Sequence, residues 1–202
     1  MSFLVLGFVT GLSLILAIGA QNIFVIEQGL KKQYVFLVCL ICSISDLILI
    51  FLGIFLFEYF KVYFTKYIEL IFNVLLFIFL VYFIYSKVRS LYKRSNLNFE
   101  NNTFSLSNII VKTLGFTYLN PHVYSDTVFF LGNFSKSFNI ENKIYFGIGA
   151  SIASFLFFFS LGYLSKIFSN KLNNRSFWKY INIFIIIFMS GIVFYIIRDI
   201  IY

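Results

Sequence analysis

Leu119-Asn120-Pro121-His122-Val123-Tyr124-Ser125-Asp126 interrupts an apolar segment that runs from about residue 109 to residue 131. The stretch contains the only proline and the only histidine of the chain. Asn followed by Pro is typical of a helix start, with Asn as the N-cap and Pro at the first helical position, where its missing N–H costs nothing. If the segment crosses a membrane, a helix begins inside the bilayer. Such backbone is tolerated there only where protein or a water-filled cavity surrounds it.

The composition indicates that the chain does reside in a membrane. Of its 202 residues, 60% are hydrophobic and only 12% are charged, whereas a soluble domain carries about 25% charged residues. The net charge of +8 does not indicate nucleic-acid binding, because the Lys and Arg residues lie in short connections between apolar runs. The partner that the composition predicts is therefore the lipid bilayer, and we expect an all-α integral membrane protein.

The apolar runs predict six transmembrane helices, since a span needs about 20 largely apolar residues. The candidate spans are residues 3–26, 35–57, 67–86, 109–131, 144–165 and 179–197. A polar loop at 87–108 separates a first three-helix half, residues 1–86, from a second, residues 109–202.

The distribution of basic residues predicts the orientation. Eleven Lys and Arg residues follow spans 1, 3 and 5, and the other five of the 16 lie on the opposite side. The positive-inside rule therefore places the 87–108 loop in the cytoplasm and both termini outside. Two halves of three spans must then have opposite orientations, which is the layout of an inverted repeat. In each half the first span carries a polar interruption, Gly19–Asn22 or Asn120–Asp126.

The second span carries a stripe of small and polar residues that contains a carboxylate. Cys39, Cys42, Ser43, Asp46 and Gly53 recur at intervals that place them along one helix face. An acidic residue in a span costs about 2.5–3.5 kcal/mol even on the lenient insertion scale, so it is a functional hypothesis by default. The two cysteines lie inside an apolar run and are interpreted as small core residues rather than as a metal or redox pair.

The two interruptions and the stripe together predict a cavity near the membrane midplane. If Pro121 starts a helix, His122 and Asp126 lie on one face and form a charge pair or a proton-relay pair. Gln21 and Asn22 add amide donors and acceptors, or they make only an interhelical polar contact. Uncompensated acids suit a cation, whereas exposed helix N-termini suit a carboxylate. A basic amino acid matches both.

Other polar and small residues of the spans have structural interpretations. We expect Glu27 to lie at the membrane interface and to pair with Lys31 one turn later, with a role in a gate as the alternative. Gly7 and Gly11 form a G-x-x-x-G pattern that permits close helix packing, or they reflect the frequency of small residues in such helices. Packing or interhelical hydrogen bonding is expected of the remaining polar residues, Asn73, Ser151, Ser154 and Ser190.

Several of these motifs resemble the lysine/arginine exporter (LysE/ArgO) family of amino-acid exporters. The first-span match is Ala17-Ile18-Gly19-Ala20-Gln21-Asn22 with the residues through Gly29, and the second-span match is Cys42-Ser43-Ile44-Ser45-Asp46. The fourth-span match is Thr117 through Asp126, and Trp178–Asn182 matches near the end. The family usually has proline where this chain has Ala20, which leaves open whether the first span is broken.

The resemblance implies export of basic amino acids, lysine or arginine, across the bacterial inner membrane, driven by protons or the membrane potential. No cofactor, metal site or catalytic residue is expected, and a homo-oligomer is left open. The alternatives are an exporter of neutral amino acids or of metal cations and, as a less favoured class, an intramembrane enzyme. The residues expected to bind substrate or couple transport are Gln21, Asn22, Asp46, Asn120, Pro121, His122, Tyr124 and Asp126.

Overall fold

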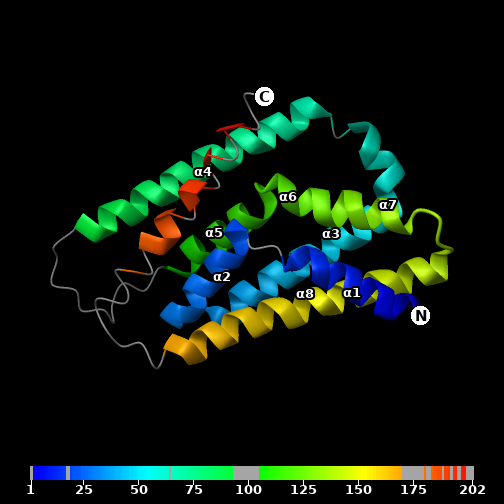
Figure 1. Cartoon of the computed structure of the whole chain (residues 1–202), viewed down its shortest axis with the longest axis horizontal. Coiled ribbons are helices and arrows are strands. Elements are labelled where there is room, and N and C mark those ends of the chain that lie inside the picture. Colours follow the sequence, from blue (N-terminus) through cyan, green and yellow to red (C-terminus); the bar gives the residue numbers. More distant parts are fainter. Residues whose placement is uncertain are drawn as a thin grey trace.

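The computed structural model describes residues 2–16, 19–63, 65–92 and 105–169, together with separate positions between 180 and 198. Every regular element in these parts of the chain is a helix (Figure 1). The elements are α1 (Phe3–Ile15), α2 (Ala20–Lys31), α3 (Val35–Tyr63), α4 (Lys66–Tyr92), α5 (Leu106–Tyr118), α6 (Pro121–Tyr124), the π-helix η1 (Ser125–Phe130), α7 (Leu131–Ser135) and α8 (Ile140–Ser169).

The described helices include three that are long and apolar enough to cross a membrane, or four if a bent pair counts as one span. The three lie at Val35–Phe57, Lys66–Tyr85 and Ile140–Ser169, and the bent pair is α1 with α2. These agree with predicted spans 1, 2, 3 and 5. Predicted span 4 is divided among α5, α6 and η1. Much of predicted span 6, most of the Trp178–Asn182 motif and residues 93–104 of the predicted loop lie outside the described residues. The six-span inverted repeat therefore remains a prediction.

The first span is broken although Ala20 stands in place of proline. Helices α1 and α2 meet at an angle of 83°. Gly19 is the N-cap of α2 in an extended conformation, and no side chain caps the helix there. The Asn22 side chain donates a hydrogen bond to the carbonyl of Ile15 (Nδ2 to O, 3.3 Å) and so connects the start of α2 to the end of α1.

The break in the fourth span has the predicted form. Helix α6 begins at Pro121, and the His122 backbone N–H donates to Asn120 Oδ1 at 3.1 Å, which makes Asn120 the N-cap. The Tyr124 hydroxyl donates to the carbonyl of Tyr118, the last residue of α5, at 2.9 Å. Both breaks are thus bridged in the same way, by a side chain early in the second helix that binds the final carbonyl of the first.

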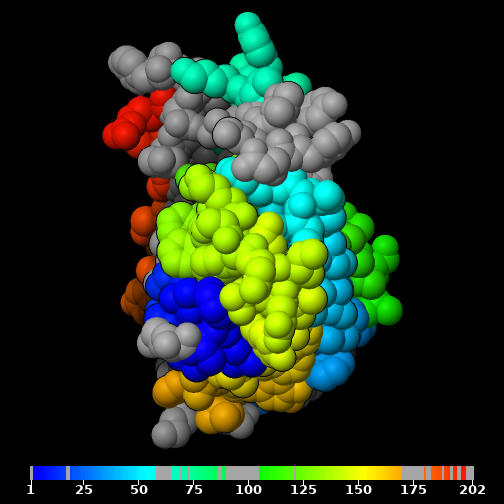
Figure 2. Space-filling view, turned by 90° about the vertical axis from the view of Figure 1, so that its right-hand side faces the viewer, coloured from blue at the N-terminus to red at the C-terminus, as the bar shows by residue number. Residues whose placement is uncertain are grey.

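Glycines let the helices approach closely around these breaks. A Cβ on Gly11 would lie 2.9 Å from Ala150 Cα, so α1 packs backbone to backbone on α8. This is the close packing that the G-x-x-x-G pattern permits, and Figure 2 shows the start of α1 (blue) beside the start of α8 (yellow). A Cβ on Gly53 would lie 2.6 Å from Val128 Cα, which brings α3 equally close to η1.

Candidate functional site

A cavity of about 640 Å³ lies where the two helix breaks meet. It is in the size range of pockets for small molecules, about 300–1,000 Å³. Of the eight residues proposed from the sequence, six line it: Gln21, Asn22, Asp46, Asn120, His122 and Asp126. Tyr124 is not among its lining residues, and the placement of the Pro121 side chain lies outside the described part of the structure. Pro121 begins α6, and Tyr124 holds α6 against the end of α5.

Helix α3 brings Asp46 to the cavity from a buried position. The Asp46 side chain is 3% exposed, and Ser154 of α8 donates a hydrogen bond to its carboxylate (Oγ to Oδ2, 2.8 Å). The rest of the predicted stripe is also buried, with Cys39, Cys42 and Ser43 at 0% exposure. The carboxylate is therefore held by a neighbouring helix at a fixed point of the cavity wall.

The second carboxylate, Asp126, lies on the π-helix η1. A π-helix is rare, and such segments occur frequently at functional sites. The Leu131 N–H donates to the carbonyl of Asp126, five residues earlier, which is the hydrogen-bond pattern of a π-helix. The Asp126 side chain is half-buried, and it interacts electrostatically with His122 one turn earlier. This is the proximity that the spacing of the two residues predicted.

The N-terminal end of α2 supplies the opposite electrostatic character. Gly19, Ala20, Gln21 and Asn22 all line the cavity at this end, where backbone N–H groups and the helix dipole favour a negative charge. Gln21 is 6% exposed. Its amide nitrogen is buried and makes no hydrogen bond to the described residues. An unsatisfied buried donor at a cavity wall suits a ligand that brings an acceptor.

The charged side chains of the cavity wall are mainly acidic. The titratable side chains of the wall are Asp46, Asp126 and His122, and no Lys or Arg is found among the described residues that line the cavity. The arrangement can therefore hold a molecule with a positive group at the two carboxylates and a carboxylate at the start of α2.

The two cysteines are buried next to residues of this wall but do not form part of it. Neither Cys39 nor Cys42 lines the cavity, and the Cys39 thiol donates to the carbonyl of Phe158 at 3.2 Å. Their burial agrees with the interpretation as small core residues. No cluster of three or more His, Cys, Asp or Glu side chains able to hold a metal ion occurs within the described parts of the chain.

The structure adds site residues that the sequence did not identify. Ser154 was expected to make packing or interhelical contacts, and its partner proves to be Asp46, which is 108 positions away in the sequence. Thr127 lines the cavity beside Asp126, and its hydroxyl donates to the carbonyl of Val123 at 2.6 Å. No pattern in the sequence distinguishes these two residues from the other Ser and Thr residues of the spans.

Known proteins resemble this chain along nearly its whole length. The family model for the LysE type translocator matches residues 12–199. The arginine exporter protein ArgO of Salmonella typhimurium (strain LT2) is 33% identical over 198 residues, which cover 96% of this chain and 92% of the relative. The protein of the same name from Pectobacterium carotovorum is 31% identical over 191 residues, 92% of each chain. No solved structure matches.

Proposed function

This chain belongs to the LysE type translocator family, and on that premise we propose that it exports basic amino acids, arginine or lysine, from the cytoplasm. As a translocator it is a membrane transporter and not an enzyme. The observation that carries the proposal is the cavity between the two broken helices, which is lined by two carboxylates and by an uncapped helix start.

In the proposed binding mode, the two charged groups of the substrate bind at two different parts of the cavity wall. The guanidinium or ammonium group of the side chain lies at Asp46 and Asp126. The α-carboxylate accepts hydrogen bonds at the start of α2, including one from the Gln21 amide nitrogen. Asn22 and Asn120 hold the remaining backbone atoms of the substrate. Pro121 and Tyr124 support this arrangement by shaping the second break.

Coupling to protons follows from the same carboxylates. Protonating Asp46 or Asp126 removes its attraction for a cation, so that a proton and a substrate cation compete for one site. We propose that His122, close to Asp126, belongs to the path of this proton. The chain would reside in the bacterial inner membrane, with six spans and the 87–108 loop in the cytoplasm.

The position of the cysteines favours this interpretation over metal export. An exporter of a soft metal ion such as cadmium would need soft ligands in the cavity, whereas neither Cys39 nor Cys42 is among its lining residues. Export of neutral amino acids would supply no positive charge to the buried Asp46 carboxylate, and no Lys or Arg stands among the described lining residues. A buried carboxylate without a counter-ion is costly in a membrane.

The test is counterflow of radiolabelled arginine and lysine in vesicles that contain the purified protein, with and without a pH gradient. We expect saturable counterflow, with leucine and cadmium ions as poor competitors. Asp46→Asn and Asp126→Asn should each abolish it while the protein still inserts into the membrane. Glu141→Gln, which removes an exposed acid at the start of α8, is the matched control. Normal counterflow in both Asp variants would contradict the assignment.

A further inference from the structure

Helices α2 and α5 extend from the cavity in the same direction and contact each other. Helix α2 begins at the cavity with Gln21 and Asn22, and α5 ends there just before Asn120. The two helices run in opposite directions, so residues later in α2 face residues earlier in α5. This pairing places two distinct layers between the cavity and the far ends of the two helices.

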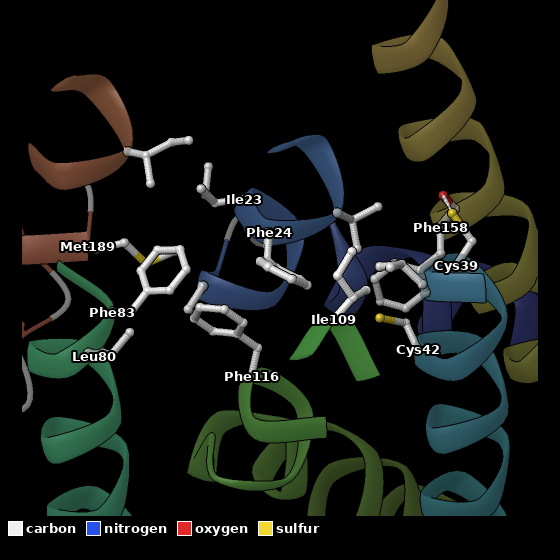
Figure 3. Close-up of a cluster of buried hydrophobic side chains, with 14 of the residues drawn as sticks. Ile23, Phe24, Cys39, Cys42, Leu80, Phe83, Ile109, Phe116, Phe158 and Met189 are labelled. Atoms are coloured by element: carbon white, nitrogen blue, oxygen red, sulfur yellow. Dashed lines mark hydrogen bonds between the residues drawn. The ribbon is translucent and has the colours of Figure 1, made fainter. Parts of the chain in front are cut away.

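The layer next to the cavity is aromatic. It consists of Phe24 of α2, Phe83 of α4 and Phe116 of α5, each no more than 3% exposed. The Phe24 and Phe116 ring centroids are 4.9 Å apart, and Phe116 and Phe83 are 5.0 Å apart in an edge-to-face arrangement. Figure 3 shows the three side chains converging from three helices. Close-packed rings of this kind block water and a polar substrate until their side chains move.

The second layer, one helical turn farther from the cavity, is charged. Glu27 follows Phe24 on α2, and Lys112 precedes Phe116 on α5. Glu27 is 2% exposed and accepts a hydrogen bond from the Lys31 ammonium group. The Lys112 ammonium nitrogen lies 5.8 Å from the centroid of the Phe83 ring. Lys112 also interacts electrostatically with Glu27 and Lys31, so the charged layer lies directly against the aromatic one.

The burial of Glu27 exceeds what a pairing at the membrane interface requires. Asp46 and Glu27 are the fully buried carboxylates among the described residues. Exposed i,i+4 ion pairs contribute little to stability, whereas a buried carboxylate is strongly destabilising once its partner is removed. Glu27 must therefore always hold a cation. Lys31 provides the hydrogen-bonded cation on a flexible side chain that is itself 21% exposed, and Lys112 is a second cation nearby.

We propose that Glu27 is a transient binding station for the cationic side chain of the substrate, and that Lys31 occupies this station while the α2–α5 side is closed. The inference rests on the proposed function. An entering guanidinium or ammonium group displaces the Lys31 ammonium, so Glu27 remains neutralised throughout. The cation then passes the faces of the aromatic layer, where a cation–π interaction is available, and reaches Asp46 and Asp126.

The test combines access to the cavity with transport kinetics. Val123→Cys places a reporter thiol in the cavity wall, and a membrane-impermeant maleimide is added to inside-out vesicles. The same variants without the reporter give the background, since Cys39 and Cys42 are fully buried. We expect Lys31→Met to accelerate labelling about tenfold by removing the cation that closes the gate. Lys32→Met, one residue away, should label at the wild-type rate.

The kinetic measurement distinguishes a substrate-binding site at Glu27 from an ion pair that only closes the gate. With arginine supplied from the cytoplasmic side, Glu27→Gln should raise KM about tenfold, because the entry site has lost its charge. Lys31→Met should leave KM unchanged or lower it. Unchanged labelling in Lys31→Met would overturn the proposal. An unchanged KM in Glu27→Gln would overturn it as well.

Two features keep the test decisive. Lys112 also faces Glu27, so the carboxylate keeps a cation in Lys31→Met, and this variant tests the gate even if the substitution of buried Glu27 prevents folding. Failure of the proposed function has a different outcome, since wild-type protein would then show no arginine counterflow at all. The labelling arm does not depend on the substrate.

Discussion

Each side of the cavity contains one half of each broken span, and the two sides are packed in opposite ways. On one side, α1 and the η1–α7 segment carry the cavity wall outward from the breaks as far as Gly11 and Leu131. On the other side, α2 and α5 contribute no lining residue beyond Asn22 and are filled by rings and an ion pair. Figure 1 places these two sides toward opposite ends of the molecule. The comparison shows that a broken helix can form a passage or a closure, depending on the side chains that its next turns carry.

The kind of contact between the helices explains why one side is open and the other is closed. On the open side, Gly53 and Gly132 bring α3 against η1 and α7 through backbone contacts, so these helices form a firm wall without filling the space beside it. On the closed side, aromatic and charged side chains fill the space between α2, α4 and α5. A barrier made of side chains can open through rotamer changes, whereas a wall made of backbone contacts moves only as a body.

The largest expected effect comes from removing a ring of the closed side. Phe116→Ala leaves a void among Phe24, Phe79 and Phe83 and should lower the free energy of unfolding by about 3 kcal/mol, the lower end for a buried Phe. Thermal unfolding in detergent measures it. Phe168→Ala, which removes a ring 57% exposed on α8, is the control. Equal effects from the two substitutions would show that the aromatic layer is not packed.

On the open side, the corresponding test adds a methyl group to a glycine at a close helix contact. Gly53→Ala places a Cβ 2.6 Å from the backbone of Val128 and should cost about 2 kcal/mol by pushing α3 away from η1. Transport should fall with it, because Asp126 lies on η1. Gly19→Ala, whose Cβ would meet nothing within 4 Å, should be sterically tolerated. Wild-type stability in Gly53→Ala would refute the close approach of these backbones.

A smaller effect is expected where α8 supports the carboxylate of α3. Ser154→Ala removes the hydrogen bond to Asp46 and should cost about 1.5 kcal/mol, or roughly tenfold in kcat/KM for arginine. Ser151→Ala on the same helix is the matched control, because its hydroxyl bonds only to the carbonyl of Gly147. If both variants transport alike, Ser154 does not position Asp46.

The smallest effect concerns the hydrogen bond that Tyr124 makes across the second break. Tyr124→Phe deletes the hydrogen bond to the Tyr118 carbonyl and should lower stability by about 1 kcal/mol. The change in arginine KM should be small, since Tyr124 is not in the cavity wall. Tyr145→Phe, at an exposed position of α8, controls for loss of a hydroxyl. A large rise in KM would instead place Tyr124 in contact with the substrate.

The sequence predicted those parts of the site that depend on local chemistry. Asn120-Pro121 identified a helix start because proline has one favourable place in a helix. Asp46 stood out because a carboxylate in a span is costly. The break at Gly19 was left open, since a glycine without proline loosens a helix without requiring it to end. The structure shows that an extended Gly19 is sufficient there.

Other parts depended on contacts between distant residues and could not be predicted. Nothing near Ser154 indicates that it binds Asp46. The π-helical turn that carries Asp126 packs against Gly53 of α3, and no sequence pattern predicted it. Glu27 was assigned to the interface because charged residues at the end of a span usually lie there. Its burial arises from the helices packed around α2.

The central claim is that Asp46 and Asp126 bind the positive charge of an amino-acid substrate, and equilibrium binding of radiolabelled arginine to the purified protein tests it most directly. Citrulline, which has nearly the shape of arginine without its charge, serves as the competitor. We expect saturable binding that unlabelled arginine displaces and citrulline does not, and no binding in the variant that carries both Asp46→Asn and Asp126→Asn. Equal competition by citrulline, or wild-type affinity in the double variant, would contradict the claim.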